Sequence, residues 1–152
     1  MPTVVLAFLT WTTVDRKAMI KAAHAAALAG LLPKLAAKGN AELMELAVVA
    51  THVHTVLRLG MGCQIPRLVQ YLKGGSAFLL NRSVPTTPIR WAGGYDLRSA
   101  SEHGLPALRR YLDNQGRHHS TPLLMRWSLV KVRDELASRT GLQPLPSAES
   151  GL

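Results

Sequence analysis

Two strand-like runs separated by a two-residue turn constrain the fold of this chain more than any other feature. The first run covers residues 43–49, the turn is Ala50-Thr51, and the second run covers residues 52–59. The second run is rich in β-branched residues and alternates in character along its length, which is typical of a strand. Together the two runs predict a β-hairpin near the middle of the chain.

The segments around this hairpin predict further strands and helices. Residues 3–14 are rich in Val, Leu, Phe, Trp and Thr and predict a buried strand. Residues 17–38 are dominated by Ala, Leu and Lys and predict a helix, which Gly30 and Pro33 are expected to break or restart. The next elements expected are a helix over about 65–80, weakened at Gly74-Gly75, and two short strands at 89–91 and 95–100. A third helix follows, with an apolar stripe of Leu105, Leu108 and Leu112, and a fourth helix is expected over about 122–139.

This order of elements predicts an α+β domain, in which helices pack on a mainly antiparallel sheet. The chain has 152 residues, which is a usual size for one domain. We expect the folded domain to span residues 1–140, and the tail at 141–152, with two prolines and two serines, to be disordered. The length leaves no room for a barrel of eight strands and eight helices.

The charge balance narrows the class of partner. Eighteen Lys and Arg against nine Asp and Glu give a formal net charge of +9. A surplus of this size on a small surface attracts phosphate polyanions, so nucleic acid is the first expected partner and an anionic membrane surface the second. The single cysteine, Cys63, cannot form an intramolecular disulfide, and the apolar start of the chain is too short for a membrane span. We therefore expect a cytoplasmic protein that is not inserted in a membrane.

The most distinctive polar pair is His52 and His54, which lie inside the second run of the hairpin. Side chains alternate along a strand, so both imidazoles are expected on the same face, where two nitrogens can converge on one divalent metal ion. The alternative is that they are half-buried strand residues that are neighbours by chance. Amidohydrolases also carry such a pair, but they need a full barrel that this length excludes.

The third predicted helix carries a second polar group. Tyr111 and Gln115 are four residues apart and therefore lie on one face of that helix, and His118 follows near the same stripe. Leu108 and Leu112 flank the stripe and should hold the helix against the sheet. Taken alone, Tyr111 is more simply explained as an aromatic residue at the core boundary, and Gln115 as a surface amide.

Four motifs, taken in their order along the chain, resemble the HUH single-tyrosine transposases of bacterial insertion sequences and their REP-associated relatives. The motifs are His52-Val53-His54, Leu72-Lys73-Gly74 with Ser76, Trp91-Ala92-Gly93-Gly94-Tyr95, and Tyr111-Leu112-Asp113-Asn114-Gln115 with His118-His119. The resemblance implies a ferredoxin-like, RRM-like HUH nuclease domain in a bacterial, nucleoid-associated protein. Relaxases of the same superfamily place their tyrosine ahead of the histidines, so a conjugative relaxase is not expected.

The resemblance implies a chemistry for these residues. His52, His54 and Gln115 would bind a catalytic Mg²⁺ or Mn²⁺, and Tyr111 would be the nucleophile that cleaves single-stranded DNA through a 5′-phosphotyrosine intermediate. Many family members have an acidic or amide residue before the histidine pair, where this chain has Thr51, a weaker hydrogen-bond acceptor than a carboxylate. The ligands and the nucleophile are all present, so we expect an active endonuclease and strand-transferase.

The resemblance also implies partners and accessory residues. The expected substrate is single-stranded DNA with hairpins at the ends of a mobile element, and the expected assembly is a homodimer. Among the cations, Lys73 falls in the family's lysine-glycine motif, and Lys73 and Arg82 are expected along a DNA groove, with a solvated helix face as the alternative. Arg58, which shares a strand face with the histidine pair by alternation, and Arg16 are further candidates for DNA contact. His118 and His119 also match the family pattern. They are expected either to contact a phosphate or donate a proton to the leaving hydroxyl, or only to cap a helix C-terminus, where the helix dipole favours them.

Three alternative functions fit the sequence less specifically. The first is a host-adopted relative that nicks chromosomal repeat hairpins with the same residues. The second is a non-catalytic nucleic-acid-binding protein in which the histidines and the tyrosine are structural. The third is a basic RNA-binding domain, which charge and small size alone suggest.

Overall fold

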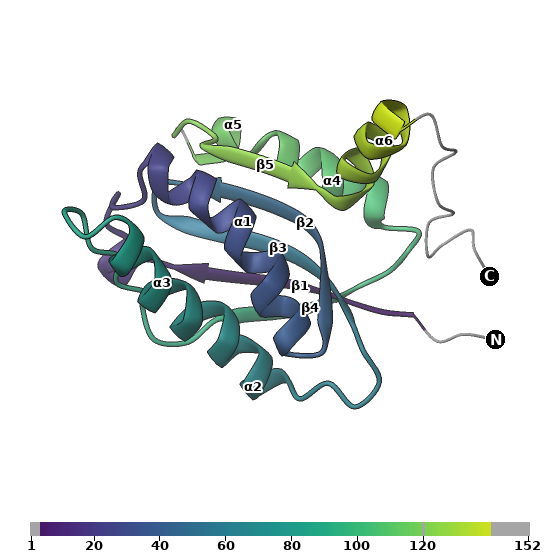
Figure 1. The fold of residues 1–152 in the computed structure, drawn as a ribbon, viewed down its shortest axis with the longest axis horizontal. Helices are drawn as coiled ribbons and strands as arrows, with labels where there is room; N and C mark the ends of the chain where they lie inside the picture. The colour runs from purple at the N-terminus through teal and green to yellow at the C-terminus, as the bar shows by residue number, and fades with distance from the viewer. Residues whose placement is uncertain (1–3, 120, 141–152) are drawn as a thin grey trace.

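An antiparallel sheet of five strands organises the structure, a computed structural model in which residues 4–119 and 121–140 are described (Figure 1). The strand order is β4-β1-β3-β2-β5, and every neighbouring pair is antiparallel. The strands are β1 (Val5–Thr12), β2 (Ala41–Val49), β3 (His52–Leu59), β4 (Asp96–Ala100) and β5 (Met125–Ser128).

Helices cover both faces of this sheet. One face is covered by α1 (Ala22–Lys38), α2 (Ile65–Val69), the π-helical segment η2 (Gln70–Gly75) and α3 (Ser76–Ser83), which lie in front of the strands in Figure 1. The other face carries α4 (Leu105–Asp113) and α5 (Gln115–His119). Two further helical segments, the 3₁₀ turn η1 (Val14–Arg16) and α6 (Leu129–Thr140), follow β1 and β5.

The alternation of side chains along the strands divides the core into two layers. Val53 and Leu57 of β3 pack in the layer beneath α1, α2 and α3. Val56, which points the other way, packs in a second layer with Leu105 and Leu112 of α4. The histidine pair has the same parity along β3 as Val56, so the fold directs it towards α4.

The predicted hairpin and fold class are confirmed. β2 and β3 pair antiparallel, with Val49 opposite His52 across the turn at Ala50-Thr51. Four of the strands follow the order β4-β1-β3-β2, and helices lie in the connections from β1 to β2 and from β3 to β4. This arrangement is that of the β-α-β-β-α-β ferredoxin-like motif. The strand β5 extends this sheet beside β2.

The first predicted helix is continuous rather than broken. α1 begins at Ala22 instead of Lys17 and runs through Gly30 and Pro33 without interruption. Its apolar face is buried under the sheet, with Leu32 fully covered beside the proline. Burial of that face outweighs the one hydrogen bond that a proline cannot donate.

The helix expected over residues 65–80 is present but changes its winding. α2 passes into η2, which spans the Gly74-Gly75 pair, and α3 continues to Ser83. Gly75 lies against α1, where an added Cβ would come within 2.9 Å of the side chain of Leu35. The glycine that weakens the helix pattern in the sequence therefore allows η2 to pack closely on α1.

The fourth helix predicted over about 122–139 is wrong in its first part. Met125–Ser128 is the strand β5, paired with residues 45–48 of β2, and α6 begins only at Leu129. The edge of β2 supplies hydrogen-bond partners that a local pattern does not reveal. The strand expected at 89–91 is reduced to one bridge between Trp91 and Thr13, whereas the strand expected at 95–100 is β4.

The predicted tail at 141–152 lies outside the described residues. The domain boundary expected at residue 140 stays a prediction. Within residues 4–119 and 121–140, no helix is both long enough and apolar enough to cross a membrane.

Replacement by alanine should change the free energy of unfolding in opposite directions at two glycines, Gly39 at the C-cap of α1 and Gly30 within the helix. At Gly39, a Cβ would lie 3.0 Å from the main-chain Cα of Leu68, so we expect Gly39→Ala to lower the free energy of unfolding by about 1–3 kcal/mol. A Cβ at Gly30 meets nothing within 4 Å, so Gly30→Ala should raise it by about 0.5–1 kcal/mol. Urea denaturation measures both values. Equal effects at the two positions would contradict the packing of α2 on Gly39.

Candidate active site

The histidine pair lies on the central strand of the sheet. His52 and His54 belong to β3, which is hydrogen-bonded to β1 on one side and to β2 on the other. The two residues are 7% and 6% exposed, and their ring centroids are 4.6 Å apart. The expected placement of both imidazoles side by side is therefore observed.

Gln115 brings a third polar side chain to the same point. It is fully buried, and its Oε1 lies 2.8 Å from His54 Nε2 and 3.4 Å from His52 Nε2. Its own Nε2 donates to the main-chain oxygen of Tyr111 at 3.3 Å, which leaves the amide oxygen to face the imidazoles. His52, His54 and Gln115 thus form one buried group, called the donor cluster below.

Two threonine hydroxyls contact the other nitrogen of each ring. Thr51 Oγ1 lies 2.8 Å from His52 Nδ1, and Thr10 Oγ1 on β1 lies 2.7 Å from His54 Nδ1. A hydroxyl can donate to a ring nitrogen or accept from it, so each imidazole is held in either tautomer. The 2.8 Å contact with Gln115 Oε1 needs a proton on His54 Nε2, because an amide oxygen only accepts. To bind a metal, the ring would instead carry its proton on Nδ1, facing the threonine hydroxyl, and offer the Nε2 lone pair to the ion.

The donor cluster suits a divalent cation. Two neutral imidazole nitrogens and an amide oxygen add no negative charge, so a bound cation would keep its field for a substrate oxygen. The amide oxygen matches the preference of Mg²⁺ and Mn²⁺, and the imidazoles match that of transition metals. In the described part of the chain, no group of three or more His, Cys, Asp or Glu could hold a metal, so the glutamine is needed for a third ligand.

Tyr111 lies beside the donor cluster and belongs to the same chain. Its ring centroid is 5.9 Å from that of His54 and 6.3 Å from that of Phe8, both in edge-on geometry. Phe8 also packs on His54, with 5.3 Å between the ring centroids. Tyr111 is 36% exposed, in contrast to the buried histidines, so a substrate can reach it.

The helix that carries Tyr111 and Gln115 is interrupted between them, which corrects the prediction of one continuous helix. α4 ends at Asp113, Asn114 has φ −101° and ψ 15°, and α5 begins at Gln115. The main-chain nitrogen of Asn114 still donates to the carbonyl oxygens of Arg110 and Tyr111, so the turn stays tight. Both side chains consequently lie beside the histidine pair despite the break.

Lys73 and Arg82 do not lie with the histidine pair, because η2 and α3 cover the opposite face of the sheet. Lys73 Nζ donates to the carbonyl oxygens of Ala92 and Gly94 at 2.7 and 2.6 Å, and burial lowers the pKa of this ammonium group. The lysine therefore ties η2 to the loop before β4. The guanidinium of Arg82 lies 5.5 Å from the centroid of the exposed Phe78 ring.

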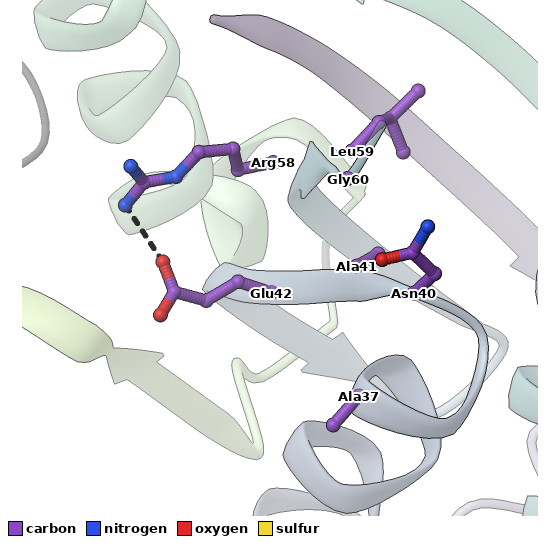
Figure 2. Close-up of a pocket in the computed structure, with 7 residues that line it drawn as sticks. All are labelled: Ala37, Asn40, Ala41, Glu42, Arg58, Leu59 and Gly60. Atoms are coloured by element: carbon purple, nitrogen blue, oxygen red, sulfur yellow. Dashed lines mark hydrogen bonds and ion pairs between the residues drawn. The ribbon is translucent and has the colours of Figure 1, made fainter. Parts of the chain in front are cut away.

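Arg58 follows the histidines along β3 but lies at the far end of the strand. Its Nη2 donates to Glu42 Oε1 at 2.7 Å, and Arg133 of α6 binds the other carboxylate oxygen at 3.3 Å. Figure 2 shows the Arg58–Glu42 pair beside a pocket of about 330 Å³. Arg58 is four residues from His54, about 13 Å at the rise of a strand. The parity that the sequence indicated does not bring this arginine to the donor cluster.

Arg16 lies at the end of the sheet that holds His52. Thr12 pairs with His52, and η1 follows this strand end at once. The main chain of η1 is hydrogen-bonded to Arg90, and the linker from η1 to α1 carries two lysines. These exposed cations at one end of the sheet are called the basic rim: Arg16, Lys17, Lys21 and Arg90.

The remaining motif residues divide into structural and undescribed ones. Trp91 Nε1 donates to Ser76 Oγ at 3.1 Å, and its ring packs edge-on against Trp11 at 5.9 Å, so this tryptophan anchors the sheet end. His118 and His119 are the last two residues of α5, and their side chains lie outside the described part of the structure. Their suggested roles stay predictions.

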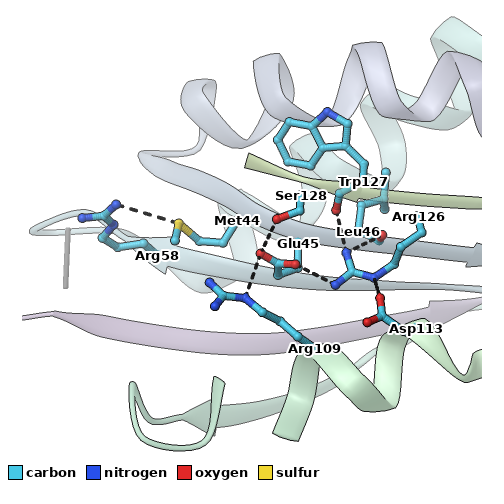
Figure 3. A network of polar contacts seen from close by, with 9 residues as sticks. All are labelled: Met44, Glu45, Leu46, Arg58, Arg109, Asp113, Arg126, Trp127 and Ser128. Atoms are coloured by element: carbon cyan, nitrogen blue, oxygen red, sulfur yellow. Dashed lines mark hydrogen bonds and ion pairs between the residues drawn. The ribbon is translucent and has the colours of Figure 1, made fainter. Parts of the chain in front are cut away.

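Glu45 is the residue near the site that sequence reasoning missed. It is fully buried in β2, and its carboxylate contacts side chains from both α4 and β5 (Figure 3). The signal in the sequence is weak, because one glutamate in an apolar strand is ordinarily a solvent-facing residue. The clue is that residues 43–49 are otherwise apolar, so a charge there interrupts a run that the core should cover.

Comparison with known proteins identifies a family and two structures of similar fold. The model of the family described as "Transposase IS200 like" matches residues 5–115. A structure from Deinococcus radiodurans R1, described as that of a candidate transposase, is 26% identical with a TM-score of 0.62 and covers 76% of this chain and 93% of its own. A REP-associated tyrosine transposase bound to a REP hairpin is 14% identical with a TM-score of 0.60, covering 97% of this chain and 88% of its own. No curated protein gives a significant match.

The family match extends over most of the chain. It begins at the first residue of β1 and ends at Gln115, so it includes the histidine pair, Tyr111 and the strands β1 to β4. The chain belongs to the IS200-like transposase family.

Proposed function

We propose that this transposase cleaves single-stranded DNA and joins it to a new strand, with Tyr111 as nucleophile and a divalent metal ion held by the donor cluster. The observation that supports this most strongly is a juxtaposition. The Tyr111 ring lies 5.9 Å from that of His54, whose Nε2 lies 2.8 Å from Gln115 Oε1. A nucleophile and a set of metal ligands within reach of one phosphate are the parts that phosphoryl transfer to a side chain requires.

Cleavage begins with attack of Tyr111 Oη on the phosphorus of a phosphodiester. The phenol loses its proton to solvent and the bond from Oη to phosphorus forms. The bond from phosphorus to the 3′ oxygen breaks, and this oxygen leaves with the electron pair and takes up a proton from solvent. The products are a 5′-phosphotyrosine and a free 3′-hydroxyl. Because the covalent link retains the energy of the phosphodiester, the 3′-hydroxyl of another strand can attack it and release Tyr111 without ATP.

The attack needs stabilisation of negative charge, because a free phenol ionises only near pH 10. Bound Mg²⁺ or Mn²⁺ would supply positive charge to the phenolate and to a non-bridging phosphate oxygen. The residues of the chain supply orientation. Thr10 and Thr51 hold the two imidazoles, and Phe8 packs against both His54 and the nucleophile.

The distribution of charge supports DNA as the partner. Residues 17–40 and 61–95, which contain α1, α2, η2 and α3, include eight of the eighteen Lys and Arg and none of the nine Asp and Glu. All eight except Lys73 are exposed. Three residues of the basic rim, Lys17, Lys21 and Arg90, belong to this group, and the rim lies at the sheet end that holds His52. The rim is therefore the part of this positive surface that we propose binds the DNA backbone nearest the donor cluster.

The substrate and the assembly follow from the resemblance. The REP-associated transposase with a similar fold is bound to a hairpin, and we propose hairpin-containing element ends as the substrate here. A host-adopted nuclease that acts on chromosomal repeats would use the same residues, and only its choice of substrate would differ. A homodimer is the proposed assembly, although the tyrosine that faces His54 in this structure comes from the same chain.

The covalent intermediate is the direct test of the nucleophile. Wild-type protein mixed with labelled single-stranded hairpin DNA and Mn²⁺ should give a protein–DNA adduct in a denaturing gel. Tyr111→Phe lacks the attacking oxygen and should reduce the adduct to background. Tyr71→Phe is the matched control and should retain it. An adduct in Tyr111→Phe would refute the assignment, and no adduct from the wild type on any hairpin would favour a non-catalytic DNA-binding protein.

Mn²⁺ titration in the absence of DNA tests the donor cluster separately. Gln115→Ala should lose the calorimetric binding signal, because it removes one of three ligands. Thr10→Val keeps all three ligands but removes the hydroxyl at His54 Nδ1, so we expect affinity to fall by about 10–100-fold. His103→Ala, which removes an exposed loop histidine, serves as the control. Equal affinity in the wild type and Gln115→Ala would place the metal elsewhere.

Salt dependence tests the basic rim. The double variant Lys17→Gln/Lys21→Gln should bind a single-stranded DNA more weakly, and the slope of log K against log salt should shrink by about 0.7 for each phosphate that the variant no longer neutralises. Lys131→Gln/Arg139→Gln removes the same charge from exposed positions on α6 and should leave the slope unchanged. Fluorescence anisotropy at several salt concentrations gives both slopes. Identical slopes for the two double variants would show that the basic rim does not bind the DNA backbone.

A further inference from the structure

A buried ion-pair network connects the helix of Tyr111 to the sheet. The carboxylate of Glu45 has three partners: Arg126 Nη2 donates to Oε1 at 2.7 Å, and Ser128 Oγ and Arg109 Nε donate to Oε2 at 2.9 and 3.4 Å (Figure 3). Arg126 in turn donates from Nε to Asp113 Oδ1 at 2.8 Å. Arg109 and Asp113 belong to α4, whereas Arg126 and Ser128 belong to β5.

These contacts flank the nucleophile on both sides. Arg109 lies two residues before Tyr111 and Asp113 lies two residues after it, so Glu45 holds α4 directly through Arg109 and indirectly through Arg126. The apolar residues of α4 hold the helix on the sheet, but apolar packing is non-directional. Charge-assisted hydrogen bonds have a fixed geometry, so they restrict the rotation of α4 and its shift along its axis.

A β-bulge places Glu45 where it can act in this way. The register between β2 and β3 shifts between Leu43 and Glu45. As a result, Leu43 and Leu46 both pack in the layer beneath α1, although they are three residues apart, and Glu45 faces α4 on the other side. Bulges commonly re-aim a side chain near a functional site.

We propose that Glu45 is a positioning residue for the reaction of Tyr111, because its network sets where α4 presents the tyrosine to the donor cluster. The inference rests on the proposed role of Tyr111 as nucleophile. Glu45 is fully buried and acts through α4, so it influences the attack without touching DNA. In-line attack is sensitive to displacements of about 1 Å, which can cost about 100-fold in rate.

The test compares variants of three carboxylate residues, two in the network that contacts α4 and one outside it. Glu45→Gln and Asp113→Asn each remove one charge from the network with little change of shape. Glu42→Gln is the matched control, because Glu42 also lies on β2 and also binds two arginines, Arg58 and Arg133, which belong to β3 and α6 rather than α4. Circular dichroism establishes that each variant is folded under the conditions of the assay.

The first readout is the environment of Tyr111 and needs no DNA. The chain has three tyrosines, so ¹⁹F NMR of 3-fluorotyrosine protein gives three signals that single Tyr→Phe variants assign. The Tyr111 signal should move or broaden in Glu45→Gln and Asp113→Asn and should stay unchanged in Glu42→Gln. If Glu45→Gln does not fold, Asp113→Asn carries the test, because Asp113 is about half exposed (52%) and its replacement leaves the Glu45 contacts intact.

The second readout is the single-turnover rate of adduct formation. It should fall by about 10–100-fold in Glu45→Gln and Asp113→Asn while the dissociation constant for the hairpin is unchanged. An unmoved Tyr111 signal in folded Glu45→Gln, or an equal loss of rate in Glu42→Gln, would overturn the proposal. If the wild type forms no adduct, the proposed function fails, whereas the NMR comparison still decides whether Glu45 places Tyr111.

Discussion

The pairing of β3 on both of its edges is the constraint on which the rest of the structure depends. β1 and β2 hydrogen-bond this strand from either side and helices cover both sheet faces, so His52 and His54 are almost completely buried. Buried polar groups are costly unless they are hydrogen-bonded, and both nitrogens of each ring find partners. Those partners are Thr10 on β1, Thr51 in the hairpin turn and Gln115 at the start of α5. The burial of two imidazoles therefore specifies how three separate segments meet.

The parts of the site that follow local rules could be predicted from the sequence. Strand alternation is a local property, so residues 52–59 alone indicate that the two histidines share a face. The four-residue spacing of Tyr111 and Gln115 is also local, and it places both near the same stripe even though the helix breaks at Asn114. What the spacing could not supply is the direction of that stripe. Only the packing of Leu105 and Leu112 on the sheet turns it towards the histidines.

The parts that depend on distant partners could not be predicted. β5 forms because the edge of β2 is open to it and because Arg126 can bind the buried Glu45, and nothing within residues 122–139 reveals either partner. The same limit explains the cations that were expected along a DNA groove. Lys73 is held by two main-chain carbonyl oxygens and Arg58 by a carboxylate, and a sequence does not show which positive charges are already occupied.

The network around Glu45 contains two carboxylates and two guanidinium groups, so its formal charge is zero. Loss of one partner from a buried pair costs about 3–5 kcal/mol, and the Arg126 side chain is only 13% exposed, so a DNA phosphate cannot easily draw this arginine away. The basic rim, in contrast, is exposed and available to DNA. In the proposed reaction, the charges that place Tyr111 would thus be separate from the charges that attract a polyanion, and binding of substrate would not loosen α4.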